Sequence, residues 1–250
     1  GLFRHTTRDV TLRGVAIPAG AKVLVSFGAA NRDPEQFERP HEFDVARDRI
    51  VFTMQGVSAP ADLHVIAGNA APRRLTDINA SRLVDVRFGE AAQFSFTGAG
   101  GDKVFGYAVK PWNWQPGKKY PVAFIVHGGP QSSFANTWSY RWNPQVYSGA
   151  GYGVVFIDFH GSTGYGQAFT DSISGDWGGK PLEDLQKGLA AALEKYPFID
   201  KGRMCALGAS YGGFMINWIA GNWNDSFKCL VNHDGNLDER FAYYDTEELW

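Results

Sequence analysis

The sequence predicts an α/β fold in which a parallel sheet follows a series of short antiparallel strands. Residues 122–126 and 154–157 are continuous apolar runs, which are typical of parallel strands buried on both faces. Residues 182–196 carry apolar side chains at helical spacing, and Pro197 directly follows them. Buried strands that alternate with helices indicate an α/β sheet, because parallel strands are joined by crossovers that cover the sheet.

The first 49 residues are polar and predict a separate β/coil fragment. Short strands are expected around residues 10–12 and 22–27, with a Pro-Ala-Gly turn between them at residues 18–20. A coil rich in proline and charge follows over residues 31–49.

Residues 50–110 differ from this fragment, because short β runs are separated by Gly, Pro, Asn and Asp. Such regular spacing is typical of an antiparallel sheet or a propeller blade. The expected strands are residues 50–54, 62–66, 83–88, 93–97 and 104–109.

Residues 111–250 hold the expected parallel sheet. Three elements follow the strands and the helix named above: a buried run at 204–207, an apolar helix at 214–219 and a strand at 229–231.

Charge and hydropathy exclude several classes of protein. The chain has 24 Lys and Arg against 26 Asp and Glu and lacks a long basic run, which argues against nucleic-acid binding. No apolar stretch reaches the roughly 18 residues that a membrane span needs. Because residue 1 is Gly and not Met, we expect the sequence to begin within a longer protein.

The two cysteines, Cys205 and Cys229, make neither a disulfide framework nor a zinc site. We expect them to be buried, inert packing residues, and the sequence predicts no metal site. Free cysteines and the lack of a signal peptide favour the cytoplasm, but only weakly.

Residues 208–213, Gly-Ala-Ser-Tyr-Gly-Gly, fit the pattern Gly-x-Ser-x-Gly between a buried strand and an apolar helix. In a nucleophile elbow, this sharp turn places the Ser210 hydroxyl at the carboxyl edge of the sheet. The first N–H groups of the helix, including that of Tyr211, would then face a developing oxyanion. The alternative is an ordinary turn with an incidental serine.

Two further loops end at the same sheet edge. Residues 127–130, His-Gly-Gly-Pro, follow the first buried strand, where the second half of an oxyanion hole is usually supplied. Residues 161–166 form a glycine-rich loop. The pattern favours a tight turn, and a substrate contact is the second interpretation. A plain glycine turn is the alternative for residues 127–130.

The motifs at residues 120–130, 161–166 and 208–213 together resemble the α/β-hydrolase domain of the prolyl oligopeptidase family. Its dipeptidyl-peptidase and acylaminoacyl-peptidase branch is the most similar. The resemblance covers roughly residues 50–250 and implies that residues 50–110 are strands of a terminal propeller blade. It also implies a serine peptidase that acts on a peptide substrate and needs no cofactor.

The same resemblance implies roles for individual residues. Ser210 would be the nucleophile, with the N–H of Tyr211 in the oxyanion hole. His127 stands where several relatives place a tyrosine donor, so it is a candidate for the oxyanion side. Phe241 and Tyr244 match the aromatic wall of the pocket for the residue before the scissile bond; a buried aromatic pair is the alternative.

The rest of the catalytic triad is not expected within the chain. In this fold the nucleophile is followed by the acid and then by the histidine. His233 is the single histidine after Ser210, and it ends the very next strand, so we expect it to pack or hydrogen bond under the pocket. The acid and the base are therefore expected beyond residue 250, which would leave the peptidase inactive as given.

Within residues 1–49, the segments 4–10, 14–20, 29–34 and 43–47 follow one another in an order that is not typical of propeller blades. Together they resemble a different family, the bacterial haem-thiolate cytochrome monooxygenases, in the stretch before the haem-binding loop. The resemblance implies a propionate contact for Arg4 and a structural arginine cluster for Arg47. No cysteine precedes Cys205, so an iron–thiolate bond is not available.

We expect a composite of two truncated fragments that meet near residues 48–50, with a divergent blade as the alternative for residues 1–49. A non-catalytic composite is the alternative function, and a haem monooxygenase is less favoured still.

Overall fold

The computed structural model divides the chain into two compact units, residues 1–51 with 65–73 and residues 52–64 with 74–250. The residues that it describes are 2–5, 9–12, 15–17, 22–25, 49–67, 69–134, 136–223, 225–236, 238, 240 and 244.

The described part of residues 1–49 is made of short antiparallel pairs. Strand β1 (Leu2–His5) pairs with β4 (Lys22–Val25), and β2 (Val10–Leu12) pairs with β3 (Val15–Ile17). The expected strands at residues 10–12 and 22–25 are thus present. The turn at residues 18–20 and the coil up to residue 48 lie outside the described residues.

Strands β5 (Arg49–Gly56), β6 (Ala59–Ala67) and β7 (Arg73–Arg74) form a three-stranded sheet, followed by the short helix α2 (Ala80–Leu83). The strand expected at residues 83–88 is wrong. Val84 and Val86 are exposed, the first to 77%. An alternation of apolar and polar residues is typical of a strand. Such a segment forms a strand only where a neighbouring strand pairs with its backbone and other residues cover one of its faces.

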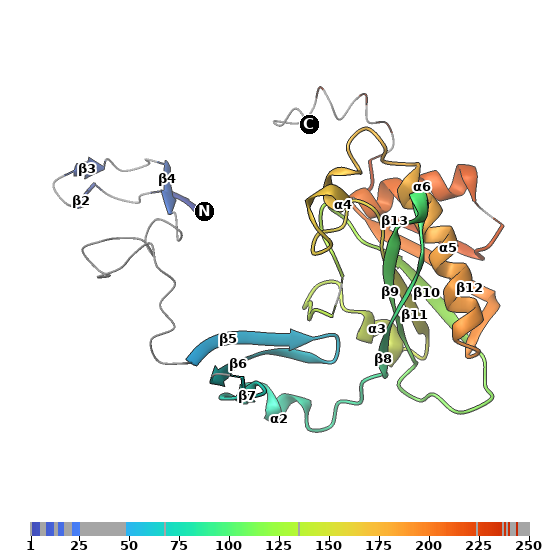
Figure 1. Cartoon of the computed structure of the whole chain (residues 1–250), viewed down its shortest axis with the longest axis horizontal. Helices are drawn as coiled ribbons and strands as arrows, with labels where there is room; N and C mark the ends of the chain where they lie inside the picture. The colour runs from blue at the N-terminus through green and yellow to red at the C-terminus, as the bar shows by residue number, and fades with distance from the viewer. Residues whose placement is uncertain are drawn as a thin grey trace. The chain divides into compact units, whose positions relative to one another are not determined.

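The second unit is built on a six-stranded mixed sheet in the order β13-β12-β10-β11-β9-β8 (Figure 1). The middle and one edge are parallel, as the apolar runs predict, whereas β8 and β9 are antiparallel. The sheet therefore extends across residues 110/111, where the sequence suggested a boundary. Its strands are β8 (Ala91–Thr97), β9 (Lys103–Val109), β10 (Tyr120–Val126), β11 (Gly153–Asp158), β12 (Ile199–Ala209) and β13 (Cys229–His233).

Helices cover both faces of this sheet. Helices α5 (Lys180–Lys195) and α6 (Tyr211–Asn222) pack on one face, and α3 (Pro144–Gly149) packs against β9 and β11 with Tyr147 in the cluster of the other face. The short helix α4 (Gln167–Asp171) lies between β11 and α5. Two covered faces explain why the central strands are apolar throughout.

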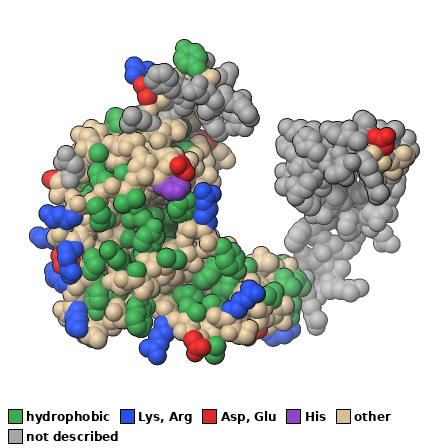
Figure 2. Space-filling model, turned by 180° about the vertical axis from the view of Figure 1, so that it is seen from behind, with side chains coloured by type: hydrophobic (Ala, Val, Ile, Leu, Met, Phe, Trp, Pro, Cys, Tyr) green, Lys and Arg blue, Asp and Glu red, His purple; other side chains and the backbone are tan. Residues whose placement is uncertain are grey.

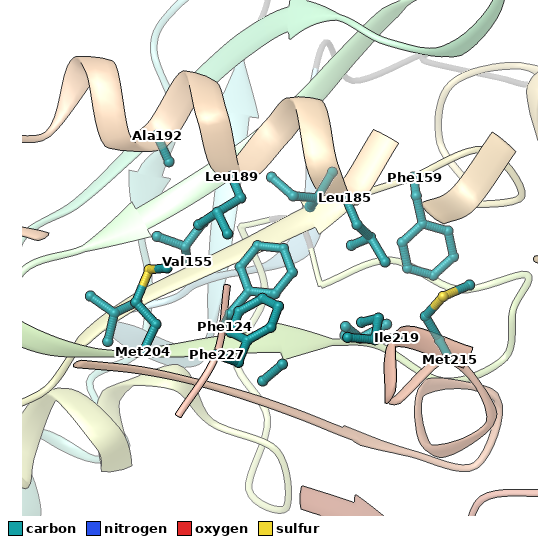
Figure 3. Close-up of a cluster of buried hydrophobic side chains, with 14 of the residues drawn as sticks. Phe124, Val155, Phe159, Leu185, Leu189, Ala192, Met204, Met215, Ile219 and Phe227 are labelled. Atoms are coloured by element: carbon teal, nitrogen blue, oxygen red, sulfur yellow. The ribbon is translucent and has the colours of Figure 1, made fainter. Parts of the chain in front are cut away.

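The larger core cluster lies between the sheet and helices α5 and α6 (Figure 3). Leu185, Leu189 and Ala192 project from one face of α5, at the spacing that the sequence predicts, and pack with Phe124 and Val155 of the sheet. All five side chains are essentially inaccessible to water. This packing holds the carboxyl edge of the sheet in place. Elsewhere, hydrophobic side chains stay at the surface, as the face drawn in Figure 2 shows.

The prediction of two buried, unpaired cysteines is wrong. Cys205 of β12 and Cys229 of β13 are register partners with a Cα–Cα distance of 4.7 Å, and a disulfide joins them. Cys229 is exposed. Direct neighbours on adjacent strands come within bridging distance, and the sequence does not show which residues become neighbours. The argument for a cytoplasmic location from free cysteines therefore loses its premise.

Two kinds of feature are absent from the part of the chain that the structure describes. No helix there combines the length and the apolar character that crossing a membrane requires. No group of three or more His, Cys, Asp or Glu side chains gathers there in a way that could hold a metal ion.

Candidate active site

Ser210 lies on the sharp strand-to-helix turn that the sequence predicts. Strand β12 ends at Ala209 and helix α6 begins at Tyr211, at the carboxyl edge of the sheet. Ser210 has φ 58° and ψ −122°, in a region that side-chain-bearing residues avoid at a cost of about 1–3 kcal/mol. The strain is sustained because the strand and the helix fix the backbone on both sides. The result is a serine that projects from the sheet edge.

The glycines on either side of the serine are required by close backbone contacts. A Cβ atom on Gly208 would collide with the backbone of Gly212, and one on Gly212 would collide with the carbonyl oxygen of Val126. Helix α6 can therefore start against the ends of β10 and β12 only with glycine at both positions. This is the physical reason for the spacing of the motif.

Ser210 opens into a cavity of about 580 Å³. Its walls are mostly apolar and come from the ends of β10, β12 and β13 and from the loops after β10. A cavity of this size and character suits a small, partly apolar ligand. The lining residues are Ile125, Val126, Gly128, Gly129, Ser132, Phe134, Arg141, Trp142, Tyr147, Leu207, Gly208, Ala209, Ser210, Val231, His233 and Asp234.

The first N–H groups of helix α6 directly follow the Ser210 turn. The first helical hydrogen bond runs from the N–H of Phe214 to the carbonyl of Ser210, so the N–H of Tyr211 has no partner within the helix. The Tyr211 side chain is buried among aromatic rings, and its hydroxyl donates to the carbonyl of Trp177 at 2.6 Å. Burial raises the pKa of Tyr211, so the phenol remains a donor. The side chain thus anchors the helix while the N–H faces the nucleophile turn.

The His127 imidazole is buried beneath the loop and does not line the cavity. Its Nδ1 lies 2.8 Å from the carbonyl oxygen of Gly128, and its Nε2 lies 2.9 Å from the hydroxyl of Ser162. Burial lowers the pKa of His127, which favours a neutral ring with the proton on Nδ1. The ring also stacks on Phe159 at 4.2 Å. Gly128 and Gly129, which follow His127, do line the cavity.

Asp158, at the end of β11, links the loop after β10 to the glycine-rich loop. Its Oδ2 accepts from the hydroxyls of Ser133 at 2.8 Å and Tyr165 at 2.5 Å, and its Oδ1 accepts from the N–H of Phe134 at 3.1 Å. The carboxylate is 1% exposed. The N–H of Thr163 also donates to the carbonyl of Ser132 at 2.9 Å. Residues 127–134 and 158–165 are therefore held as one assembly, although residues 161–166 do not line the cavity.

A second buried network lies at the base of the same loops. His160 Nδ1 lies 2.6 Å from a carboxylate oxygen of Asp184, and His160 Nε2 lies 3.1 Å from Asp102. Asp184 also accepts from the backbone N–H of Ala99 at 2.7 Å. These contacts tie helix α5 to the end of β11 and to the turn before β9. The network supports the loops and does not reach the cavity.

Four charged or aromatic residues of one part of the cavity wall are among those that were not predicted as site residues. Arg141, Trp142, His233 and Asp234 line it, and the side chain of His233 is 47% exposed with its Nδ1 3.2 Å from a carboxylate oxygen of Asp234. His233 was expected to pack under the pocket, but it stands in the wall. Its position at the carboxyl end of a strand was a usable signal. Arg141 and Trp142 come from a loop without a recognisable motif.

Two predicted residues are not brought to the cavity by the described structure. Phe241 lies outside the described residues. Tyr244 is 82% exposed and is not among the lining residues. The Ser210 hydroxyl makes no hydrogen bond with any described residue, so no described imidazole acts on it in this geometry.

Comparisons with known proteins agree with this arrangement. Residues 138–250 match the family model of the prolyl oligopeptidase family, and residues 1–47 match that of cytochrome P450. Both resemblances noted in the sequence are thus confirmed.

Among curated relatives, dipeptidyl-peptidase 5 of Schizosaccharomyces pombe is 49% identical over 156 residues, which covers 62% of this chain and 23% of the relative. Dipeptidyl-peptidase 5 of Aspergillus oryzae is 48% identical over 149 residues, covering 59% and 20%. The chain thus spans about a fifth of the length of these relatives.

Solved structures extend the similarity to the fold. An acylaminoacyl peptidase of Pyrococcus horikoshii superposes with a TM-score of 0.71 at 26% identity, covering 80% of this chain and 31% of the other. An acylaminoacyl peptidase in complex with Z-Gly-Gly-Phe-chloromethyl ketone gives 0.72 at 28%, covering 80% and 32%. The α/β-hydrolase fold class is confirmed, and the relationship is to serine peptidases of the prolyl oligopeptidase type.

Proposed function

We propose that the chain carries the nucleophile side of a serine peptidase of the prolyl oligopeptidase type, in which Ser210 forms the acyl-enzyme. The observation that supports this best is Ser210 itself, strained at φ 58° on a strand-to-helix turn that opens into an apolar cavity. A structural serine has no need of that conformation. Backbone strain of this kind is typical of functional sites.

In the proposed mechanism, Ser210 Oγ bonds to the carbonyl carbon of a peptide, and the carbonyl oxygen becomes an oxyanion. The N–H of Tyr211 donates to that oxyanion from the start of α6, where the helix dipole adds to its effect. The backbone after His127 forms the opposite side, with the His127 ring as its support. Phe241 and Tyr244 are proposed for the aromatic wall of the substrate pocket.

The proton of the Ser210 hydroxyl needs an acceptor, because a neutral hydroxyl is a weak nucleophile. None of the described histidines is hydrogen-bonded to it. Removal of the base from a serine-protease triad reduces turnover by on the order of 10⁶-fold. We therefore propose that the chain as it stands has negligible peptidase activity.

The relatives support a substrate class. The names dipeptidyl-peptidase and acylaminoacyl peptidase denote peptidases. We extend a peptide substrate, cleaved at a dipeptidyl or aminoacyl position, to this chain as a proposal.

We further propose that the chain is a composite of two fragments of different origin. Residues 1–49 are the monooxygenase-like fragment, and residues 50–250 are the peptidase-like fragment, in which propeller-like strands over 50–110 precede part of a hydrolase domain over 111–250. The first segment does not fit a haem–thiolate site. It contains no cysteine, and Cys205 and Cys229 are tied to each other in a disulfide. A non-catalytic composite is the alternative to the peptidase.

Labelling with a fluorophosphonate tests the proposal. In this reaction Ser210 Oγ bonds to phosphorus, fluoride leaves, and the hydroxyl proton passes to the buffer. We expect slow modification at Ser210 and none in Ser210→Ala, with less than a thousandth of an intact relative's turnover of an aminoacyl nitroanilide. Labelling that is absent, or that Ser210→Ala leaves unchanged, favours the non-catalytic composite.

A further inference from the structure

One cation in the wall of the Ser210 cavity is not used by the proposed acyl transfer. The guanidinium carbon of Arg141 lies 5.0 Å from the centre of the Trp142 ring. No carboxylate of the described residues lies within ion-pair distance of Arg141, whereas Arg74, Arg203 and Arg240 each pair with an aspartate. Arg141 is thus held beside the cavity by an aromatic face, without an opposite charge.

The wall next to Arg141 is aromatic. The rings of Trp142 and His233 lie 5.1 Å apart, nearly perpendicular. Phe134 and Tyr147 line the same cavity and add apolar surface. An apolar group can therefore lie against this wall while a polar group of the same ligand reaches the guanidinium.

We propose that Arg141 and Trp142 form a subsite that binds a carboxylate adjacent to an apolar side chain of the peptide substrate. The inference rests on the proposed peptidase function of the same cavity. A guanidinium presents its N–H groups in a planar fork that matches a carboxylate, and its contact with an aromatic face leaves the edges of the fork free. The carboxylate is either a free C-terminus or an acidic side chain.

Asp234 is the charge that opposes such a ligand. It lines the same cavity, and its nearest partner is Nδ1 of His233 at 3.2 Å. A hydrogen bond from the imidazole does not remove the negative charge of this carboxylate. Removal of the Asp234 charge therefore strengthens carboxylate binding, and removal of the Arg141 charge weakens it. A purely structural role of either residue does not produce these opposite effects.

Binding is measured in Ser210→Ala, so that no chemistry at the nucleophile enters the result. The reporter is the indole N–H resonance of Trp142, assigned by Trp142→Phe, during titration with N-acetylphenylalanine or N-acetylphenylalaninamide. These two ligands differ only in a carboxylate against a neutral amide. A third ligand, N-acetylphenylalanylglutamic acid α-amide, carries the γ-carboxylate alone and tests a side-chain carboxylate. We expect dissociation constants in the millimolar range for ligands of this size.

We expect the acid to bind about fivefold more tightly than the amide, a modest ratio because Arg141 is exposed and its charge is screened. In Arg141→Gln the ratio falls to about one, Arg141→Lys retains part of it, and Asp234→Asn increases it. Arg203→Gln removes an exposed arginine outside the cavity and leaves the ratio unchanged. The third ligand shows whether the subsite reads a terminal or a side-chain carboxylate.

The proposal is overturned if the acid and the amide bind equally, if neither ligand shifts the Trp142 resonance, or if Arg141→Gln weakens both ligands to the same degree. Failure of the peptidase proposal would be seen separately, as a lack of fluorophosphonate labelling at Ser210. The two results are independent, because the titration requires no reaction.

Discussion

Replacement of Asp158 by Asn or Ala tests whether one buried carboxylate organises the loops around the cavity. The carboxylate is 1% exposed and accepts from Ser133, Phe134 and Tyr165 at 2.5–3.1 Å. In Asp158→Asn, the amide oxygen can still accept from the fixed N–H of Phe134. The two hydroxyls must then rotate to accept from the new NH₂ group. All three contacts survive in number, but each loses its charge assistance.

The magnitude follows from this count. A hydrogen bond to a charged group contributes about 1.5–3 kcal/mol and a neutral one about 0.5–1.5 kcal/mol, so three contacts lose about 3 kcal/mol together. Part of this loss is recovered because a buried charge no longer has to be desolvated. We therefore expect Asp158→Asn to lower the free energy of unfolding by about 1–3 kcal/mol. Asp158→Ala leaves the half-buried N–H of Phe134 and the two hydroxyls without their acceptor and costs about 3–5 kcal/mol.

Urea denaturation followed by tryptophan fluorescence measures both values, and an unchanged slope with denaturant shows that the change lies in stability. Asp225→Asn, at an exposed aspartate outside this network, is the matched control and should change the free energy by less than about 0.5 kcal/mol. If Asp158→Asn equals the wild type and Asp158→Ala is no worse, the carboxylate does not organise these loops.

Three other substitutions give further tests. Gly212→Ala forces a Cβ atom against the carbonyl of Val126, so we expect loss of Ser210 labelling by fluorophosphonate; labelling at the wild-type rate would contradict the close approach. Phe124→Ala opens a cavity in the larger core cluster and should cost about 3–5 kcal/mol of unfolding free energy, measured with urea, and a cost below 1 kcal/mol would show a site that collapses. Asp62 accepts from the N–H of Ile78 and from Thr76 and Arg74, the first having the largest effect, and together they lower its pKa from 3.8 to about 2. Because the folded-state pKa is below the unfolded one, its stabilisation is present above about pH 4 and is lost as the pH falls to about 2, so Asp62→Asn should flatten the acid limb of a stability–pH curve in that window.

The sequence predicts the parts of the fold whose cause is local. Residues 122–126 and 154–157 are apolar without interruption because both faces of their strands are covered. This pattern can be recognised in the amino-acid sequence alone. The turn at Ser210 was predictable for the same kind of reason, since Gly208 and Gly212 are demanded by contacts within the turn and with the strand beside it.

Features that depend on which segments become neighbours could not be predicted. The disulfide between Cys205 and Cys229 requires the register of two strands, and the strand expected at residues 83–88 failed because no partner pairs with it. The cavity wall combines Arg141 and Trp142 from one loop with His233 from the end of β13, more than 90 residues away in sequence. Chain order argued against His233 as a triad member but did not indicate where its side chain would lie.

The shared carboxylate of Asp158 also defines what can be exchanged in protein engineering. Residues 127–134 hold two of the donors, residues 158–165 hold the acceptor and the third donor, and Ser162 and Thr163 add two more links between the segments. Grafting residues 127–134 alone would leave the backbone N–H of Phe134 without its acceptor, and grafting residues 158–165 alone would leave the buried negative charge of Asp158 short of donors. The two loops are therefore one transplantable module, and a library that diversifies them independently would consist mostly of poorly folded members.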